Sequence, residues 1–211
     1  MKNIDYTLYL VTDRNQPLEG RFEAVVEEAI QGGVTLVQLR EKEGDTGLLY
    51  ERAEKLKKIT ERLHIPLIID DRIDIMMAVD ADGVHVGQSD MPASIARKMI
   101  GPDKILGVSA GSLKEAVKAE ADGADYLGVG AMFPTDTKKD ADFTSMETLQ
   151  SIIHAVHIPV VAIGGINKER VSLFDGMGIS GFAAVSAVMA SKNPKQSAMA
   201  LKKAIKNLKN I

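Results

Sequence analysis

Apolar residues fall into eight short runs along the chain, and the segments between the runs have a helical period. The runs occupy residues 7–13, 36–41, 66–70, 83–87, 104–110, 126–132, 159–165 and 181–187. Several of them, such as "PLIID" and "PVVAIGG", are almost continuously apolar, which is typical of strands buried on both faces of a parallel sheet. The pattern therefore predicts eight strands, each followed by a helical segment.

The segments between the runs place apolar residues at steps of three and four, which predicts amphipathic helices. Phe22, Val25, Val26, Ala29 and Ile30 form one such face, and Leu49, Ala53, Leu56, Ile59 and Leu63 form another. Ser112 with Glu115 and Thr144 with Glu147 have the spacing of a capping box, in which a hydroxyl and a carboxylate satisfy the first backbone N–H groups of a helix. Two later helices are predicted to begin there.

Eight strand-helix units point to one fold class. At about 25 residues per unit, they predict an α/β protein with a parallel sheet covered by helices, and eight such units can close a barrel. An open doubly wound sheet is the alternative, but it usually has fewer strands, and no G-x-G-x-x-G follows the first strand here. No Pro/Ser-rich linker interrupts the pattern. We predict a single-domain (β/α)8 TIM barrel with eight parallel strands over residues 1–211.

Composition narrows the classes of partner and compartment. Lys and Arg number 26 against 29 Asp and Glu, giving a net charge of -3, so the chain has no broad basic face for nucleic acid. The absence of cysteine excludes disulfides and thiolate metal sites and favours the cytoplasm. The first apolar run, which ends at Asp13, is too short and too polar for a signal peptide or a spanning helix, so no membrane is expected. Small molecules are the expected partners, and a homo-oligomer is left open.

A cationic cluster is expected at the mouth of the barrel, because barrel active sites lie at the C-terminal ends of the strands. In "VQLREK" the side chains alternate between faces, so Gln38, Arg40 and Lys42 are predicted to face the mouth together. A guanidinium fork and an ammonium group aimed at one cavity suit a phosphate or diphosphate. The alternative is that Arg40 and Lys42 only neutralise nearby acids such as Glu41 and Glu43.

Carboxylates follow the next two strands. Asp70 and Asp71 end the third run, and Asp90 comes just after the fourth in "GQSD". Adjacent strand ends lie about 5 Å apart, so carboxylates from both strands can share one hard cation, and Mg2+ prefers oxygen ligands that include substrate phosphates. The alternative is that Asp71 caps the helix that follows it.

Hydroxyls and glycines occur at later strand ends. Ser109 lies beside two glycines, and Gly164, Gly165 and Ser186 follow the last two strands, where barrels commonly hold a phosphate. A loop serine without a ligand and a tight glycine turn are the alternatives. His85 lies inside a strand and is expected to be packed and hydrogen-bonded rather than catalytic. Two phosphate-compatible regions with "PTDTKK" between them favour a two-substrate transferase.

At these positions the chain resembles the thiamine-phosphate synthase family. The resemblance covers nearly all of residues 8 to 190 and rests on seven motifs in family order: "YLVTD", "VQLREK", "ADGVHVGQSDMP", "GVSA", "GADYLGVGAMFPTDTKKD", "IPVVAIGGI" and "AVSAVM". It implies a barrel enzyme that joins a pyrimidine diphosphate to a thiazole phosphate and releases pyrophosphate with Mg2+. The family's reaction is dissociative, so it needs charge neutralisation and positioning rather than a strong protein base.

The resemblance also implies roles for individual residues. The pyrimidine diphosphate would be held by Gln38, Arg40, Lys42, Ser109 and Lys138, of which Arg40, Lys42, Ser109 and Lys138 are the expected catalytic residues. Mg2+ would be held by Asp71 and Asp90. The thiazole phosphate would be held by Thr135, Thr137, Gly165, Val185 and Ser186, and the substrate-binding positions also include Leu39, Glu41 and Asp136. Asp70, commonly Asn in the family, would touch the pyrimidine, either with a changed hydrogen-bond pattern or as a protonated acid.

Two other functions are weighed against this one. A thiazole tautomerase would resemble the synthase without its diphosphate site, but an isomerase of a monophosphate would not need Arg40, Lys42, Asp71, Asp90 and Lys138 together. A ligand-binding regulator on the same scaffold would bind thiazole phosphate without turnover.

Overall fold

Eight parallel strands close into a barrel in the computed structural model, which describes residues 4–16, 20–135 and 143–209. The strands are β1 (Leu8–Val11), β2 (Leu36–Leu39), β3 (Leu67–Asp70), β4 (Gly83–Val86), β5 (Ile105–Ala110), β6 (Tyr126–Val129), β7 (Val160–Ile163) and β8 (Gly181–Ala184). β1 pairs with β2 on one side and with β8 on the other, where Leu8 lies opposite Phe182. The predicted barrel is therefore confirmed, and the open sheet is excluded.

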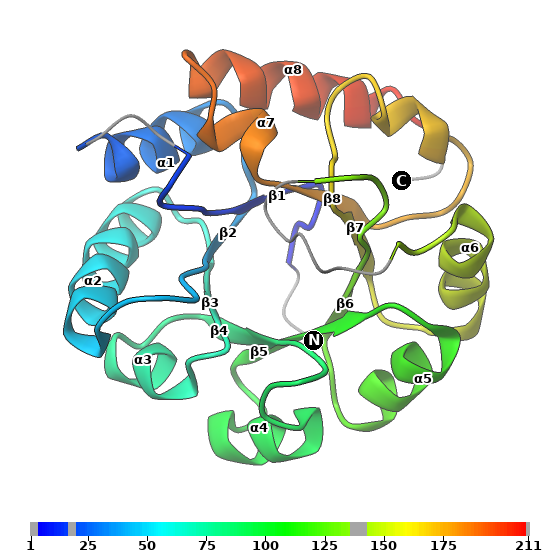
Figure 1. Cartoon of the computed structure of the whole chain (residues 1–211), viewed down its shortest axis with the longest axis horizontal. Helices are drawn as coiled ribbons and strands as arrows, with labels where there is room; N and C mark the ends of the chain where they lie inside the picture. Colours follow the sequence, from blue (N-terminus) through cyan, green and yellow to red (C-terminus); the bar gives the residue numbers. More distant parts are fainter. Residues whose placement is uncertain (1–3, 17–19, 136–142, 210–211) are drawn as a thin grey trace.

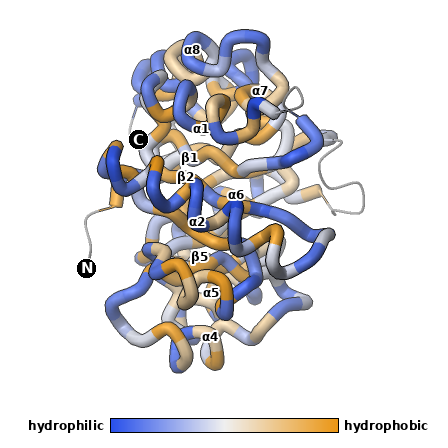
Figure 2. Tube along the Cα trace, turned by 90° about the vertical axis from the view of Figure 1, so that its left-hand side faces the viewer, coloured by the Kyte–Doolittle hydropathy of each residue, from blue (hydrophilic) through white to orange (hydrophobic). Residues whose placement is uncertain are grey.

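Helices surround the barrel in a ring (Figure 1). They are α1 (Phe22–Gln31), α2 (Thr46–Arg62), α3 (Ile73–Ala78), α4 (Ala93–Ile100), α5 (Leu113–Ala121), α6 (Met146–Ala155), the 3-10 helix η1 (Val171–Phe174), α7 (Ser186–Met189) and α8 (Pro194–Lys206). In Figure 2 the central strands are mostly orange, whereas the helices mix blue and orange residues, as amphipathic helices do. None of the helices in the described part of the chain is long and apolar enough to cross a membrane.

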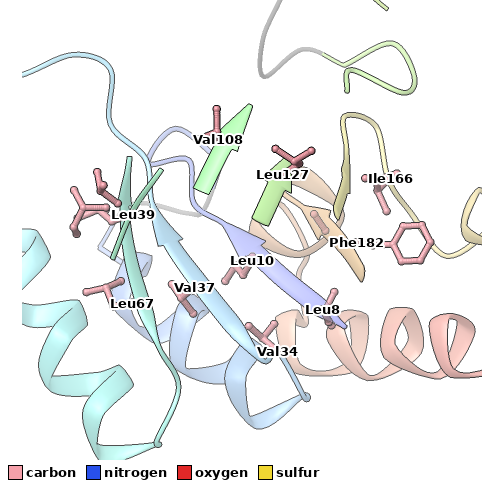
Figure 3. Packing of buried hydrophobic residues seen from close by; sticks show 14 of the residues in the cluster. Leu8, Leu10, Val34, Val37, Leu39, Leu67, Val108, Leu127, Ile166 and Phe182 are labelled. Atoms are coloured by element: carbon pink, nitrogen blue, oxygen red, sulfur yellow. The ribbon is translucent and has the colours of Figure 1, made fainter. Parts of the chain in front are cut away.

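The alternation of side chains along each strand separates two hydrophobic layers. The barrel interior holds Tyr6, Tyr9, Val11, Leu36, Ile68, Ile105, Tyr126, Val161 and Ala183. Leu8, Leu10, Val37, Leu39 and Leu67 belong to the larger layer between strands and helices, part of which Figure 3 shows. Because Leu36 faces inward and Val37 outward, the interior side of β2 continues to Gln38, as predicted.

The hydrogen-bonded strands are shorter than the apolar runs that predicted them. β2 ends at Leu39 and β3 at Asp70, although the run in the first case extends to residue 41. Residues such as Arg40 and Lys42 therefore lie beyond the ladder, at the C-terminal rim. This rim is where the polar side chains gather.

The predicted helix faces and one of the two predicted caps are confirmed. All five apolar residues predicted for α1 are buried, and in α2 Leu49, Ala53 and Leu56 are buried while Ile59 and Leu63 pack against the core. Ser112 Oγ accepts a hydrogen bond from Glu115 N at 3.3 Å at the start of α5.

The predicted cap at Thr144 is wrong. Ser145 Oγ accepts the hydrogen bond from Thr148 N, at 3.1 Å, so α6 begins one residue later than the capping box indicated. Thr144 is buried, and its N–H donates to the carbonyl of Ala131 at 2.9 Å. Contact with the loop after β6 has therefore drawn this threonine into the core.

Candidate active site

Two cations and two carboxylates meet where β2 and β3 end. Lys42 forms ion pairs with both Asp70 and Asp71, with its Nζ 3.0 Å from Asp70 Oδ2. Arg40 Nε lies 3.8 Å from the same oxygen. Although burial opposes the charge, the two carboxylates raise the pKa of Lys42 above its ordinary value, so its ammonium group stays charged. The structure thus places positive charge from β2 beside the acids of β3.

Glu41 does not neutralise these cations. Its carboxylate is buried, with a side chain only 3% exposed, and it forms an ion pair with Arg52 of α2. Leu39 likewise packs into the layer under the helices. Any substrate contact at Leu39 or Glu41 therefore falls to the backbone. Of the two acids named in the neutralising alternative, Glu41 thus pairs with Arg52, while Arg40 and Lys42 pair with Asp70 at the end of β3, and Lys42 also with Asp71.

Asp71 and Asp90 converge from neighbouring strand ends. Burial, the charge of Asp70 and a hydrogen bond with Asp90 outweigh the opposing effect of Lys42 and raise the pKa of Asp71 from 3.8 to about 6. Asp71 does not cap α3, since that helix begins at Ile73 after an N-cap residue without a side-chain cap bond. Asp90 Oδ2 accepts a hydrogen bond from Gly87 N at 2.9 Å, which fixes its loop.

The carboxylate oxygens at this rim are suited to a magnesium ion that also binds phosphate oxygens of a substrate. Asp71 Oδ1 is buried and makes no hydrogen bond within the described chain, whereas Asp70 Oδ2 lies 3.0 Å from Lys42 Nζ. Buried carboxylate oxygens without donors are available to a cation. Within residues 4–16, 20–135 and 143–209, no three His, Cys, Asp or Glu side chains form a complete metal site. Two carboxylates with further oxygens from a phosphate match the usual Mg2+ environment.

A series of hydrogen bonds through the barrel interior links Ser109 to Gln38. Its Oγ lies 2.9 Å from His85 Nε2, and His85 Nδ1 lies 3.0 Å from Tyr126 Oη. Tyr126 Oη is 2.8 Å from Tyr9 Oη, which accepts a 2.7 Å hydrogen bond from Gln38 Nε2. The expectation that His85 is packed and hydrogen-bonded is confirmed. The two tyrosines were missed because each stands in an apolar strand, where an aromatic residue indicates core.

A second polar region lies across the mouth, after β6, β7 and β8. It is a cavity of about 300 Å³ lined by Gln16, Pro134, Thr135, Gly165, Ile166, Asn167, Arg170, Ser186 and Ala187. Three residues predicted to bind one phosphate, Thr135, Gly165 and Ser186, are thus brought together. Val185 precedes α7 and packs against the barrel interior.

The glycine pair after β7 is required by the backbone. Gly164 and Gly165 have φ values of 98° and 65°, in the left-handed region that favours glycine. A Cβ atom on Gly164 would lie 2.7 Å from Ala131 Cα, and one on Gly165 would lie 2.9 Å from the Pro134 carbonyl. The tight-turn interpretation is therefore correct, and the same turn forms the cavity wall.

Arg170 is a cation of this cavity that the sequence interpretation missed. Its Nη1 donates to the Gly165 carbonyl at 2.7 Å, and its guanidinium lies 4.8 Å from the centre of the Phe133 ring. These contacts hold the arginine against the loop after β7. In the sequence it belongs to "NKERV", where no local signal separates it from an ordinary exposed cation such as Lys168.

Part of the predicted site lies outside the described residues. Asp136, Thr137 and Lys138 fall in the range 136–142, so their roles stay predictions from the "PTDTKKD" motif. Thr135, the residue immediately before this range, lines the second cavity.

One family model and two curated relatives that match the chain share one activity name. The family model of thiamine monophosphate synthase matches residues 8–188. A thiamine-phosphate synthase of Clostridium botulinum is 57% identical over 212 residues, covering 100% of both chains. Another, of Clostridium beijerinckii, is 58% identical over 199 residues, or 94% of this chain and 95% of the relative.

Solved structures extend the comparison. A thiamine phosphate pyrophosphorylase from Pyrococcus furiosus has a TM-score of 0.88 and 41% identity, with 96% of each chain covered. A KGPDC from Streptococcus mutans has a TM-score of 0.73 at 18% identity, covering 96% of this chain and 98% of that one, and shows a likeness of fold alone. Because the family model spans most of the chain and such close relatives match nearly its whole length, the chain belongs to the thiamine monophosphate synthase family.

Proposed function

We propose that this transferase of thiamine biosynthesis condenses 4-amino-2-methyl-5-(diphosphooxymethyl)pyrimidine with 4-methyl-5-(2-phosphoethyl)thiazole, giving thiamine phosphate and pyrophosphate. The observation that carries the proposal is the pairing of two anion-suited regions at one barrel mouth. One is the cluster of Arg40, Lys42, Asp70, Asp71 and Asp90, and the other is the cavity that holds Arg170. Because the chain has no cysteine and both substrates are small phosphorylated molecules, we place the reaction in the cytoplasm.

Arg40 and Lys42 are suited to hold the diphosphate. Both extend from the rim beyond β2, and their side chains are 21% and 44% exposed, so they are held by carboxylates on one side and open to a ligand on the other. Lys42 supplies a point charge and Arg40 a planar fork with several donors. Ser109 adds a hydroxyl from β5. Together these groups neutralise a leaving group that gains charge as it departs.

Asp71 and Asp90 would hold Mg2+ together with diphosphate oxygens, and their convergence with an unpartnered buried oxygen supports that role. When bound, the ion neutralises negative charge on the diphosphate. The residues of the chain then position the reactants. The C–O bond of the pyrimidinylmethyl diphosphate breaks with its electron pair on pyrophosphate, and the thiazole nitrogen lone pair forms the new C–N bond. No proton leaves the reacting atoms, so no protein base is required.

The second cavity would orient the thiazole phosphate. Thr135 and Ser186 offer hydroxyl groups, and Arg170 offers a cation whose aromatic stacking keeps it in place. Anchoring the phosphate tail of the acceptor there would hold its ring toward the rim of β2 to β5. Such positioning turns a bimolecular step into one within the complex.

Incubation of the pure protein with both substrates and Mg2+, followed by an assay for thiamine phosphate, tests the proposal. Folded protein that yields no product would contradict it. A tautomerase would convert thiazole phosphate without the diphosphate substrate and would not bind pyrophosphate tightly with Mg2+. A regulator would bind thiazole phosphate without turnover, so measured turnover excludes it.

Asp70→Asn is expected to tighten the binding of pyrophosphate by about threefold to tenfold, because it removes a buried negative charge beside Lys42 and Arg40. Inhibition by added pyrophosphate measures the change. Glu43→Gln, which neutralises an exposed acid of the same loop, is the matched control and should have little effect. Weaker binding in the Asp70 variant would show instead that this carboxylate is needed to orient Lys42.

Arg170→Ala is expected to raise KM for thiazole phosphate by about tenfold to a hundredfold, because a charge-assisted contact to the phosphate is lost. KM for the pyrimidine diphosphate should stay within about twofold. Steady-state kinetics with each substrate varied in turn measures both values. Lys168→Ala removes a neighbouring cation whose side chain is 62% exposed, and it serves as the control. An equal rise in both KM values would contradict the assignment.

A further inference from the structure

A hydrogen-bonded series of side chains crosses the barrel interior beneath the proposed site. We call Gln38, Tyr9, Tyr126, His85 and Ser109, in that order, the polar chain. Its members come from β2, β1, β6, β4 and β5, and its four links measure 2.7, 2.8, 3.0 and 2.9 Å. It begins and ends at the two residues, Gln38 and Ser109, that face the mouth. Ser109 has a role in the proposed mechanism and the family resemblance gives Gln38 a substrate-binding role, whereas the three residues in between have no role yet.

The order of donors along the polar chain follows from counting hydrogens. Gln38 Nε2 donates to Tyr9 Oη, and within the described residues Tyr126 Oη is the one acceptor in reach of the Tyr9 hydroxyl hydrogen. An arrangement that satisfies both phenol hydrogens therefore has Tyr9 donating to Tyr126. Tyr126 then has only His85 Nδ1 left as an acceptor, which requires that nitrogen to be unprotonated. Burial raises the pKa of both phenols far above the ordinary value, so both keep their hydrogens.

The two ends of the polar chain are then fixed. A neutral imidazole with a bare Nδ1 carries its proton on Nε2, which donates to Ser109 Oγ. Within the described residues, the Ser109 hydroxyl hydrogen then has no acceptor, and the Gln38 amide oxygen Oε1 accepts no hydrogen bond. Ser109 therefore presents a donor, and Gln38 Oε1 presents an acceptor.

Glycines make room for this arrangement. A Cβ atom at Gly107 of β5 would lie 2.3 Å from Tyr126 Oη and 2.4 Å from His85 Nδ1. One at Gly128 of β6 would lie 3.1 Å from His85 Cε1. Neither glycine has a positive φ, so the backbone conformation does not require glycine at these positions. The space is needed for the polar chain itself.

We propose that the polar chain sets the hydrogen-bond polarity of the pyrimidine subsite, with an acceptor at Gln38 and a donor at Ser109. A ligand that donates toward β2 and accepts toward β5, such as an amino-substituted heteroaromatic ring with a phosphate ester, matches this polarity. Tyr9, Tyr126 and His85 are positioning residues, because they act through the two end residues. The inference rests on the proposed function for the identity of the ligand, but the polarity belongs to the free protein.

Nitrogen NMR of protein labelled with 15N-histidine tests the polarity without turnover. The His85 resonances, assigned by their loss in His85→Gln, should report protonated Nε2 and bare Nδ1 at neutral pH. A protonated Nδ1 in the wild type would reverse every link and overturn the inference. Tyr126→Phe removes the donor to Nδ1 and should shift the tautomer balance toward protonated Nδ1.

The kinetics of two matched variants tests whether the polar chain affects the use of the pyrimidine substrate. Tyr126→Phe should lower kcat/KM for the pyrimidine diphosphate by about tenfold, the effect of one buried hydrogen bond, and leave KM for thiazole phosphate unchanged. Tyr6→Phe is the control, since Tyr6 packs on Tyr126 with ring centres 5.0 Å apart but lies outside the polar chain. Equal behaviour of the two variants would overturn the inference. An inactive wild type would instead refute the proposed function, and the tautomer result would stand independently.

Discussion

Asp71→Asn is expected to lower turnover by about 10²- to 10³-fold while making the Mg2+-free protein more stable at neutral pH. Activity falls because a ligand oxygen with full negative charge is lost from the proposed metal site, and charge neutralisation on the leaving group contributes several kcal/mol. Stability rises because the native carboxylate is partly buried beside Asp70 and Asp90, which disfavours its ionisation. Steady-state kinetics and chemical unfolding without Mg2+ measure the two effects.

The stability effect should depend on pH in a definite direction. The pKa of Asp71 is about 6 in the folded protein against a usual value of 3.8, so the folded state holds a proton that the unfolded state releases between about pH 4 and 6. Stability from this group is therefore present below about pH 4 and is lost as the pH rises to about 6. At pH 7 the Asn variant should gain about 1–2 kcal/mol over the wild type, and at pH 4 the difference should largely disappear.

Asp74→Asn is the matched control for this prediction. Asp74 lies three residues further along, its side chain is 61% exposed, and it pairs with Arg72 at the surface. It should leave both turnover and Mg2+ dependence unchanged. If Asp71→Asn kept wild-type turnover, the carboxylate would not belong to the metal site. If it destabilised the protein at pH 7, the ion pair with Lys42 would outweigh the repulsion.

Lys138→Ala is expected to leave the fold intact and lower turnover by about 10²- to 10³-fold. The lysine belongs to the "PTDTKKD" motif, which the resemblance places against the diphosphate, and removal of one preformed charge from a leaving group has an effect of this size. A substitution of a lysine outside the hydrophobic core should change the free energy of unfolding by no more than about 0.5 kcal/mol. Kinetics and thermal unfolding measure the two quantities.

Lys139→Ala separates a specific role from a general charge effect, because it removes the adjacent lysine of the same motif. That variant should retain nearly wild-type turnover. Inhibition by pyrophosphate should weaken in the Lys138 variant and stay unchanged in the Lys139 variant. Equal losses in both would indicate that the two lysines contribute only a diffuse positive field, and wild-type kinetics for Lys138→Ala would refute its assignment.

The fold was accessible from sequence because it rests on local periodicity. Apolar runs of five to seven residues suit strands buried on both faces, and the amphipathic segments between them suit helices that cover those strands. The alternation in "VQLREK" also predicted which side chains of β2 face inward, and Gln38 indeed adjoins the interior layer. The predicted helix cap at Thr144 was wrong because the neighbouring Ser145 can cap equally well. Thr144 instead donates its N–H to the carbonyl of Ala131, so Ser145 caps the helix.

The sequence by itself determined the eight strands and the types of polar residue at each strand end, and it favoured parallel closure over an open sheet. The tertiary structure decided which of those residues meet. Lys42 faces Asp70 and Asp71 rather than its neighbour Glu41, Arg170 reaches the cavity that holds Thr135, and Tyr9 bonds to Tyr126 from 117 positions away. Periodicity specifies the face on which a side chain lies, because that depends only on nearby residues. Partners across the barrel depend on its closure and register, which arise from all eight strands together.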